Sequence, residues 1–279
     1  MKNKIVLITG GNSGIGKATA IGIAKTGATV IIACRNKERG MQAVEEIKKA
    51  GGNNNVDLLL MDLASQASVR NAVTEFKSRY KQLHVLINNA GVFLRNRELT
   101  ADGIEKTFAT NYLSHFLLTQ LLLDMLKASA PARIINVASK HGGIKINFDD
   151  LMTTQNYSFM KAVGPTKLAM VMFSNELAKR LQGTGVTVNS LHPGLAKSNL
   201  LNDIPALPRF LFNLIMTSPE KCAETSIYLA TSPEVENVTG QYFEKKKAVK
   251  AGPNALNEAD NKQLWDVSVK LAGLGNGWT

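Results

Sequence analysis

The sequence predicts an α/β fold: one doubly wound parallel sheet with helices on both of its faces. Three observations lead to this prediction. Short apolar segments alternate with longer amphipathic ones, a glycine-rich turn follows the first apolar segment, and no linker, low-complexity tract or internal repeat divides the 279 residues. Such alternation implies right-handed crossovers between parallel strands. We therefore expect a single domain over residues 1–279.

Six short segments are predicted as strands because each is apolar on both faces and rich in Val, Ile or Leu, which is typical of parallel strands covered on both sides. They are residues 5–8, 29–33, 56–61, 83–87, 133–137 and 186–191. A last strand is expected near residues 240–243.

The amphipathic segments between these strands are predicted as helices. They are residues 17–26, 38–49, 68–80, 103–127 and 166–181. Two late segments interrupt the alternation. Residues 200–216 are apolar and contain Pro205 and Pro208, so they form either a lid over an apolar pocket or a packed pair of surface helices. Residues 248–279 are a C-terminal extension.

The net charge is +11, from 33 Lys and Arg against 22 Asp and Glu. This surplus favours anionic partners or is simply a basic surface, but no basic stripe interleaved with aromatic residues indicates nucleic-acid binding. Two distant cysteines, Cys34 and Cys222, predict neither a disulfide framework nor a metal site. The first apolar run is too short for a signal peptide and no segment is long enough to span a membrane, so we expect a cytoplasmic protein.

The glycine-rich turn at residues 9–16 reads TGGNSGIG. Glycines between a strand and a helix permit a tight turn and close approach of the backbone to a pyrophosphate, and the helix directs free N–H groups at that anion. The turn predicts a dinucleotide site in a Rossmann fold. The residues expected to bind the cofactor there are Gly10, Asn12, Ser13, Gly14, Ile15 and Gly16.

The end of the second strand predicts which dinucleotide is bound. An acidic residue about 20 residues past the turn would bind the adenosine ribose of NAD, but here the strand runs into Cys34, Arg35 and Asn36. Arg35 can donate two hydrogen bonds to a 2′-phosphate. NADP(H) is therefore favoured, and the alternative is that Arg35 is an ordinary solvated residue.

Polar and small residues follow the third and fourth strands. Asp62 and Leu63 end one, and Asn89, Ala90 and Gly91 end the other. Ligands of open α/β sheets lie at the carboxyl ends of the strands, so we expect both groups at the cofactor. Asp62 is placed to accept a hydrogen bond from the adenine amino group, and the small residues let the backbone approach the ribose.

These motifs, together with Asn111, Ser139, Lys167 and the pair Pro193-Gly194, occur in the order and spacing of the short-chain dehydrogenase/reductase family. The chain resembles this family over roughly residues 1–245. Residues 148–151, 240–243 and 264–268 are similar to its retinol dehydrogenase-like members. This resemblance implies an NADP(H)-dependent enzyme that acts on apolar alcohols, aldehydes or ketones. It also implies a homodimer or homotetramer formed through the helices at 103–127 and 166–181.

The resemblance also implies roles for single residues. Lys167 would bind the nicotinamide ribose and lower the pKa of a neighbouring phenol, Ser139 would hold the substrate oxygen, and Asn111 would support a water that relays protons to Lys167. Pro193 and Gly194 would line the nicotinamide. Ser198, where the family usually has Thr, would meet the pyrophosphate.

One position departs from the family pattern. The family's acid/base is a Tyr four residues before the Lys, on the same helix face, but this position is Val163, which can neither donate nor accept a proton. Tyr157 and Lys161 also spell YxxxK, yet this register would turn Lys161 away from the cofactor. Pro165 is expected near a helix start, which would leave Tyr157 in the preceding loop.

We therefore expect an NADP(H)-dependent oxidoreductase with an atypical or impaired proton donor, for which His141 and Tyr157 are substitutes. Two alternatives keep the same fold and cofactor. One is a non-redox enzyme, such as an isomerase, cyclase or dehydratase, and the other is an NADP(H)-binding sensor.

Overall fold

The predicted strands form one sheet in the structure, a computed structural model that describes residues 1–140, 142–195 and 217–275. Within these residues the sheet has eight strands in the order β3-β2-β1-β4-β5-β6-β7-β8. The strands are β1 Ile5–Thr9, β2 Thr29–Cys34, β3 Val56–Leu60, β4 Val85–Asn88, β5 Ala132–Val137, β6 Val186–His192, β7 Tyr242–Glu244 and β8 Lys247–Val249. The order reverses between β1 and β4, which is where such folds bind their ligands.

Strands β1 to β7 pair in parallel, as predicted. Strand β8 was not predicted, and it pairs antiparallel with β7 through a tight turn. Lys245 and Lys246 occupy that turn with φ of 49° and 65°. Strands of three residues are too short to show a measurable periodicity, so this hairpin could not be recognised from the sequence.

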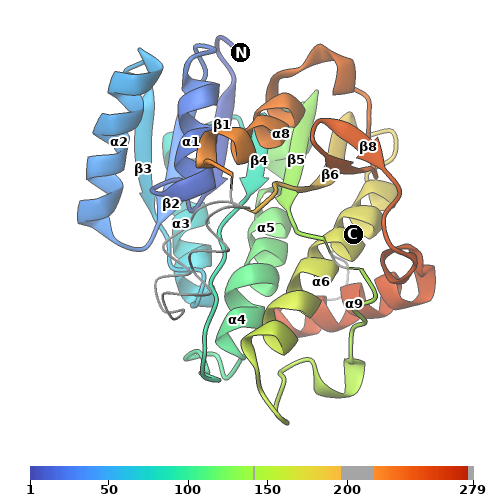
Figure 1. Cartoon of the computed structure of the whole chain (residues 1–279). Coiled ribbons are helices and arrows are strands. Elements are labelled where there is room, and N and C mark those ends of the chain that lie inside the picture. Colours follow the sequence, from blue (N-terminus) through green and yellow to red (C-terminus); the bar gives the residue numbers. More distant parts are fainter. Residues whose placement is uncertain (141, 196–216, 276–279) are drawn as a thin grey trace.

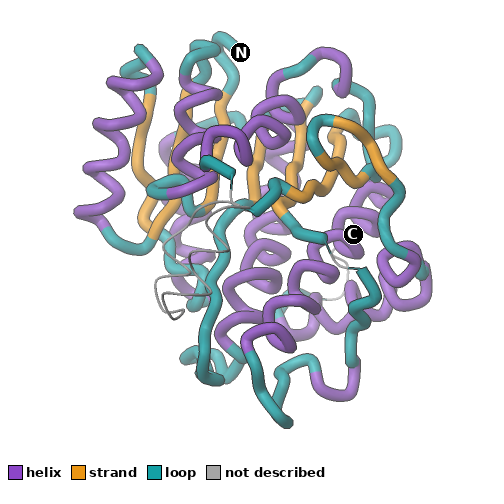
Figure 2. Tube along the Cα trace, viewed as in Figure 1, coloured by secondary structure: helices purple, strands orange, loops and turns teal. Residues whose placement is uncertain are grey.

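Helices cover both faces of the sheet (Figure 1). On one face α1 Gly14–Ala24, α2 Lys37–Gly51 and α8 Pro219–Thr231 pack on a core that includes Ile8 and Ile32. On the other face α3 Gln66–Arg79, α5 Ser114–Ala128, α6 Phe159–Arg180 and α9 Glu258–Leu271 pack on a core that includes Leu7 and Ile31. The layered arrangement is the predicted Rossmann fold, with purple helices flanking orange strands in Figure 2.

Two helices, α8 and α9, were not predicted from the sequence. Both begin at a capping side chain: Ser218 accepts a hydrogen bond from the Lys221 N–H, and Asn257 accepts from Ala259 and Asp260. A cap followed by Pro219 or by acidic residues is a start signal that could have located them. Short 3₁₀ turns lie at Phe148–Asp150, Pro233–Val235 and Pro253–Leu256.

The long helix predicted at residues 103–127 is divided. It begins as α4 Lys106–Phe108, continues as a π-helical turn at Ala109–Leu113, and becomes α5. A π turn inserts one residue into the helical repeat and is often found at functional sites. Asn111 lies at the centre of this turn.

The prediction that Pro165 marks the start of a helix is wrong. Helix α6 begins at Phe159, and Pro165 lies inside it. The Ser158 hydroxyl caps the first turn by accepting from the Lys161 N–H. Because Pro165 is the seventh helical residue, it removes one backbone hydrogen bond while the cap and the buried Ala162 and Val163 hold the turn before it. Tyr157 does lie in the loop that precedes the helix.

Residues 200–216, predicted as a lid or a pair of surface helices, lie outside the described residues. The C-terminal extension contains α9, which ends at Leu271.

Candidate functional site

The glycine-rich turn joins β1 to α1 at the carboxyl edge of the sheet. Gly10 and Gly14 have φ of +66° and +52°, which glycine adopts without strain. A Cβ at Gly16 would lie 2.3 Å from the Gly10 carbonyl oxygen and 2.5 Å from Asn89 Nδ2. At Gly14 it would meet nothing within 4 Å. The turn is therefore tight toward the protein and open on its outer side.

The first turn of α1 has free N–H groups. The N-cap residue Ser13 makes no side-chain cap hydrogen bond, whereas the N-caps of α2, α3, α6, α8 and α9 each accept one. Asn12 and Ile15 are half-buried beside the exposed Ser13 and Gly14. An accessible helix N-terminus with uncapped N–H groups fits a phosphate group.

Thr9 links this turn to the end of β4. Its hydroxyl accepts hydrogen bonds from the backbone N–H groups of Asn89 (2.9 Å) and Ala90 (3.0 Å). It lies 2.9 Å from Nε2 of His115, a fully buried residue whose Nδ1 lies 3.3 Å from the Asn111 carbonyl oxygen. Burial lowers the pKa of His115 to about 3, so the ring is neutral: Nδ1 donates to Asn111 and Nε2 accepts from Thr9.

Sequence reasoning did not single out Thr9 and His115. A polar residue that ends an apolar strand was a signal for Thr9. His115 had no comparable signal, because its partners are 106 residues away and on its own helix.

The second and third strands end at the same edge of the sheet as the glycine-rich turn. Arg35 directly follows β2 and is exposed, as is Arg39 in the first turn of α2. Sequence reasoning missed Arg39, although its position three residues after the cap Asn36 was readable. Asp62 is half-buried, with Oδ1 accepting from the Ala64 N–H. Leu63 is buried, and its carbonyl oxygen accepts from Ser114.

Lys167, Asn111 and Gly91 converge although they are far apart in the sequence. A Cβ at Gly91 would lie 3.4 Å from Asn111 Oδ1 and 3.6 Å from Lys167 Nζ. Lys167 Nζ donates to the Val137 carbonyl oxygen at 3.1 Å. Burial lowers the pKa of Lys167 to about 8. The amine therefore lies at the carboxyl end of β5 and is easily deprotonated for a lysine.

Asn111 is held in place by the loop after β4. Its Oδ1 accepts from the Val92 N–H at 2.7 Å, and its Nδ2 donates to the Val92 carbonyl oxygen at 3.0 Å. The same Nδ2 lies 3.5 Å from the hydroxyl of Thr166, which donates to the Val163 carbonyl oxygen. These contacts fix the side chain of Asn111 next to the turn of α6 that carries Val163 and Lys167.

Ser139 and the pair Pro193-Gly194 follow neighbouring strands, β5 and β6, so they lie at the same edge of the sheet. Ser139 is half-buried, and its carbonyl oxygen accepts from the Tyr242 hydroxyl at 3.1 Å. Gly194 has a φ of +96°. Ser198 and His141, both named from the sequence, lie outside the described residues.

Val163 is 7% exposed and lies one helical turn from Lys167. The Tyr157 hydroxyl donates to the Leu94 carbonyl oxygen at 3.1 Å and lies 3.3 Å from the Thr107 hydroxyl. Lys161 is exposed in the first turn of α6. These hydrogen bonds tie Tyr157 to the loop after β4 and to α4, not to Lys167.

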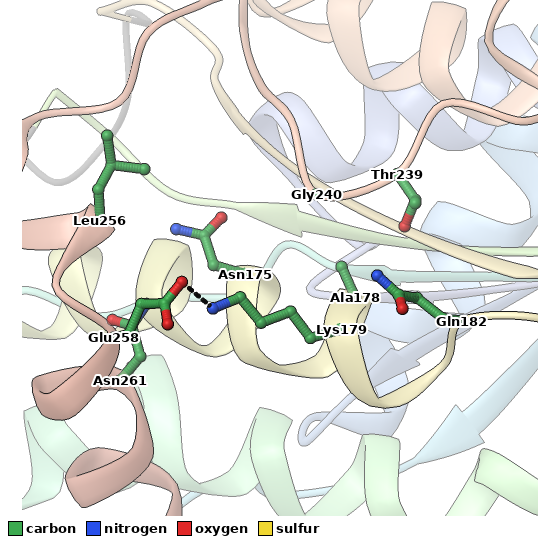
Figure 3. A pocket seen from close by; sticks show the side chains of 9 residues that line it. All are labelled: Asn175, Ala178, Lys179, Gln182, Thr239, Gly240, Leu256, Glu258 and Asn261. Carbon is green, nitrogen blue, oxygen red and sulfur yellow. Dashed lines mark hydrogen bonds and ion pairs between the residues drawn. The ribbon is translucent and has the colours of Figure 1, made fainter.

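One cavity lies away from these residues. It has a volume of about 260 Å³ and is bordered by α6, the residues just before β7, the end of the 3₁₀ turn at Leu256 and the start of α9 (Figure 3). Its lining residues are Asn175, Ala178, Lys179, Gln182, Thr239, Gly240, Leu256, Glu258 and Asn261, none of them a predicted site residue. Among the described residues no group of three or more His, Cys, Asp or Glu side chains could hold a metal ion.

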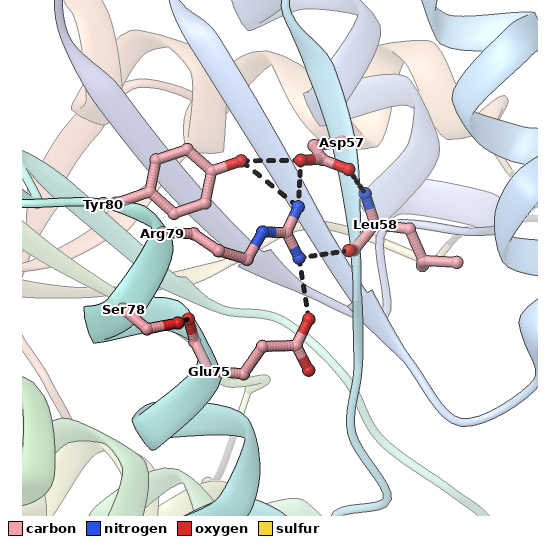
Figure 4. A network of polar contacts seen from close by, with 6 residues as sticks. All are labelled: Asp57, Leu58, Glu75, Ser78, Arg79 and Tyr80. Atoms are coloured by element: carbon pink, nitrogen blue, oxygen red, sulfur yellow. Dashed lines mark hydrogen bonds and ion pairs between the residues drawn. The ribbon is translucent and has the colours of Figure 1, made fainter.

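A polar network at the β3 edge is also separate from the site (Figure 4). Arg79 donates to the Glu75 carboxylate and to the Leu58 carbonyl oxygen, and it forms an ion pair with Asp57. Burial raises the pKa of Asp57, but the hydrogen bonds from Tyr80 and Arg79 outweigh it and lower that pKa. The network covers polar backbone at the edge strand of the sheet, which discourages pairing with another chain.

Comparisons with known proteins show which family the chain belongs to. Residues 4–207 match the family model described as short chain dehydrogenase. The chain is 45% identical to mouse retinol dehydrogenase 14, over 98% of this chain and 87% of that one. It is 42% identical to human retinol dehydrogenase 13, over 97% and 85%.

Solved structures show the same fold. An uncharacterised protein from Mycobacterium paratuberculosis superposes with a TM-score of 0.80 at 30% identity, over 98% of this chain and 94% of that one. The NADP complex of Pseudomonas aeruginosa RhlG gives 0.71 at 28% identity, over 91% and 97%. In the part of this chain that the structure describes, none of the helices combines the length and apolarity needed to cross a bilayer. The chain belongs to the short-chain dehydrogenase family of oxidoreductases.

Proposed function

We propose that this chain is an NADP(H)-dependent oxidoreductase for an apolar alcohol or carbonyl substrate, with a slow proton-transfer step. One observation carries the proposal: an open, uncapped glycine turn lies at the same sheet edge as the cluster of Lys167, Asn111 and Gly91. The turn can hold the pyrophosphate of a dinucleotide, and the cluster would then meet its nicotinamide end. NADP or NADPH is present in related structures, including that of RhlG and that of an actinorhodin polyketide ketoreductase.

The preference for NADP(H) follows from charge at the end of β2. Arg35 and Arg39 are both exposed there, and the N-terminus of α2 begins at Lys37. A 2′-phosphate would gain charge-assisted hydrogen bonds from the guanidinium of Arg35. A ribose hydroxyl of NAD would find no acidic acceptor at this position, because residues 34–36 are Cys, Arg and Asn.

The chain's own residues bind and orient the reactants. When bound, the nicotinamide supplies or accepts a hydride. Lys167 would bind the adjacent ribose through an ammonium held 3.1 Å from the Val137 carbonyl oxygen. Ser139 would hold the substrate oxygen by a hydrogen bond, and Asn111, fixed by both polar groups of Val92, would order water beside Lys167. Pro193 and Gly194 would form the wall behind the ring.

An apolar substrate is supported by the loop after β4 and the start of α6. Phe93, Phe159 and Met160 are 42%, 44% and 63% exposed. The hydrogen bond from Tyr157 to Leu94 holds these two segments together. Several relatives are named retinol dehydrogenases, and retinol is an apolar alcohol. These exposed side chains can contact such a substrate on its way to Ser139.

Proton transfer is the weak step in this proposal. Val163 has no ionisable group, and its position beside Lys167 is the one from which a phenol would reach the substrate oxygen. Without a positioned acid, the proton must come from water or from a group that is less well placed. We therefore expect full cofactor affinity and low turnover.

Titration of NADPH and NADH against the purified chain tests the cofactor assignment. Arg35→Ala should weaken NADPH binding by roughly ten- to a hundredfold, the value of a charge-assisted hydrogen bond, and leave NADH binding unchanged. Lys49→Ala, at the other end of α2, is the matched control. Equal loss for both cofactors, or none for either, would show that Arg35 does not read the 2′-phosphate. Product formed without loss of NADPH absorbance would point to non-redox chemistry instead.

A further inference from the structure

Most of helix α5 is buried within a single chain. Phe116, Leu117 and Leu118 are fully buried, and ten of its 15 residues are buried in all. The exposed large hydrophobic side chains of the described residues lie elsewhere: Met41, Leu60, Phe93, Leu99, Phe159, Met160, Leu195, Val249 and Leu256. A face that awaits a second copy should show an apolar patch in the free chain, and α5 shows none.

Helix α9 packs on α6 and reaches α5 through Trp265. Trp265 is 3% exposed and packs edge-on against Phe116, with ring centroids 5.1 Å apart, and 6.0 Å from the ring of Phe173 on α6. The guanidinium of Arg180 lies 4.2 Å from the centroid of the same indole ring. In Figure 1, α9 (red) runs across α6. One side chain of α9 thus joins both helices that we expected to meet a second copy.

Both ends of α9 are tied to other helices. At its start, Glu258 pairs with Lys179 of α6 at 2.6 Å, as Figure 3 shows. At its end, Arg70 of α3 donates to the Ala272 carbonyl oxygen at 2.7 Å. The first pair is exposed and contributes little by itself, but the second caps the C-terminus of the helix. Helix α9 is therefore fixed across the helical layer from α6 to α3.

A buried hydroxyl pair marks the middle of the contact. Ser268 donates to the Leu264 carbonyl oxygen at 2.6 Å, so the Tyr112 hydroxyl, 2.7 Å away, must donate to Ser268 Oγ. Both residues are fully buried. Tyr112 directly follows Asn111 in the π turn. A polar contact this deep forms only where α9 is docked in one register, because an unpaired buried hydroxyl is costly.

We propose that α9 occupies, within one chain, the surface of α5 and α6 through which family members were expected to assemble, so that this chain does not associate through that face. The surface has a fitted partner of its own, with an indole anchor, a buried hydrogen bond and a tie at each end. A second copy could reach α5 only by displacing α9. This inference does not depend on the proposed activity.

The first experiment locates any subunit interface. The mass of the full chain is measured by sedimentation equilibrium over a wide range of concentrations, for the wild type and for Asp124→Arg at the outer end of α5, which would place like charges on both sides of a symmetric interface there. We expect either the mass of one chain or an association that this charge reversal leaves intact. A dimer or tetramer that the variant dissociates would overturn the proposal.

The second experiment tests the anchor. Trp265→Ala should lower the melting temperature by about 5–10 °C, because it removes a buried aromatic side chain, and should increase binding of a dye that reports exposed apolar surface. Asp266→Ala, the exposed neighbour, is the matched control and should change neither value. If Trp265→Ala does not fold, Ser268→Ala replaces it, with a decrease of about 2–6 °C for the lost buried hydrogen bond. Variants as stable as the control would show that α9 is not seated on α5 and α6.

Discussion

Replacing Val163 with Tyr should raise turnover while leaving cofactor binding unchanged. The position lies one helical turn before Lys167 and is 7% exposed, so a phenol there would share the face of α6 that carries the amine. Burial lowers the pKa of Lys167 to about 8, so at pH 7 its side chain is mostly charged. A neighbouring ammonium lowers the pKa of a phenol and makes it a better proton donor.

The expected gain follows from what a positioned acid contributes. General acid catalysis is worth roughly 10²–10⁴-fold in rate, or about 3–5 kcal/mol of transition-state stabilisation. Because Val163 contributes none of this, Val163→Tyr should recover a substantial part, at least about tenfold in kcat. The affinity for NADPH should change by less than about threefold, since Lys167 is unchanged and the other groups that we expect to hold the cofactor lie on other elements.

The assay follows NADPH absorbance with a panel of apolar aldehydes and ketones, from pH 6 to 9. Val163→Phe is the matched control, because it adds a ring of nearly the same volume without the hydroxyl. If the Tyr and Phe variants turn over at the same rate, the hydroxyl is not what the site lacks. A wild type that already turns over as fast as the Tyr variant would mean that another group donates the proton.

Three further predictions concern the glycine-rich turn, the amine of Lys167 and the β3 edge of the sheet. Gly16→Ala should weaken NADPH binding at least about tenfold in a fluorescence titration, because its Cβ would lie 2.3 Å from a backbone oxygen, whereas Gly275→Ala, with nothing within 4 Å, should bind normally. Lys167→Met should raise the free energy of unfolding at pH 7 by about 1 kcal/mol while abolishing turnover. The native pKa of about 8 lies below the ordinary 10.5, so the cost of burying the charge is present in full below pH 8 and fades toward pH 10.5. In denaturant titrations, the difference in unfolding free energy between Lys167→Met and the wild type should therefore fade between pH 8 and pH 10.5. A Lys167→Met variant that is less stable than the wild type at pH 7 would contradict this prediction. Asp57→Asn should lose about 0.5–1 kcal/mol at pH 7, because the half-exposed ion pair with Arg79 is screened by solvent. The pKa of Asp57 is lowered in the folded state, so the stability lost in Asp57→Asn should shrink as the pH falls through that pKa. A loss of stability that is independent of pH would argue against the ion pair.

Local patterns in the sequence were enough for the parallel strands and the glycine-rich turn. A buried parallel strand is apolar on both faces, so it can be recognised from its own five or six residues. The turn at residues 9–16 is equally local, because its tight side needs glycine and its position between a strand and a helix is readable. Arg35 in place of an acidic residue, and Val163 in place of Tyr, were also visible from the sequence alone.

Contacts between distant residues were decided only by the tertiary structure. Thr9 makes hydrogen bonds with Asn89, Ala90 and His115, which follow it in the sequence by 80, 81 and 106 positions. No periodicity in the sequence encodes such contacts. Pro165 appeared to mark a helix start because its ring disfavours helix interiors, yet the Ser158 cap and the burial of Val163 outweigh that local preference. Helix α9 is the clearest case. Its sequence shows only an amphipathic segment, and whether its apolar face meets another chain or its own is settled by Trp265 packing between α5 and α6. The sequence by itself determined the parallel strands and the glycine-rich turn, and it predicted a cofactor site and an absent proton donor, because each depends on neighbouring residues. The tertiary structure decided which distant side chains converge, because that depends on how whole helices pack.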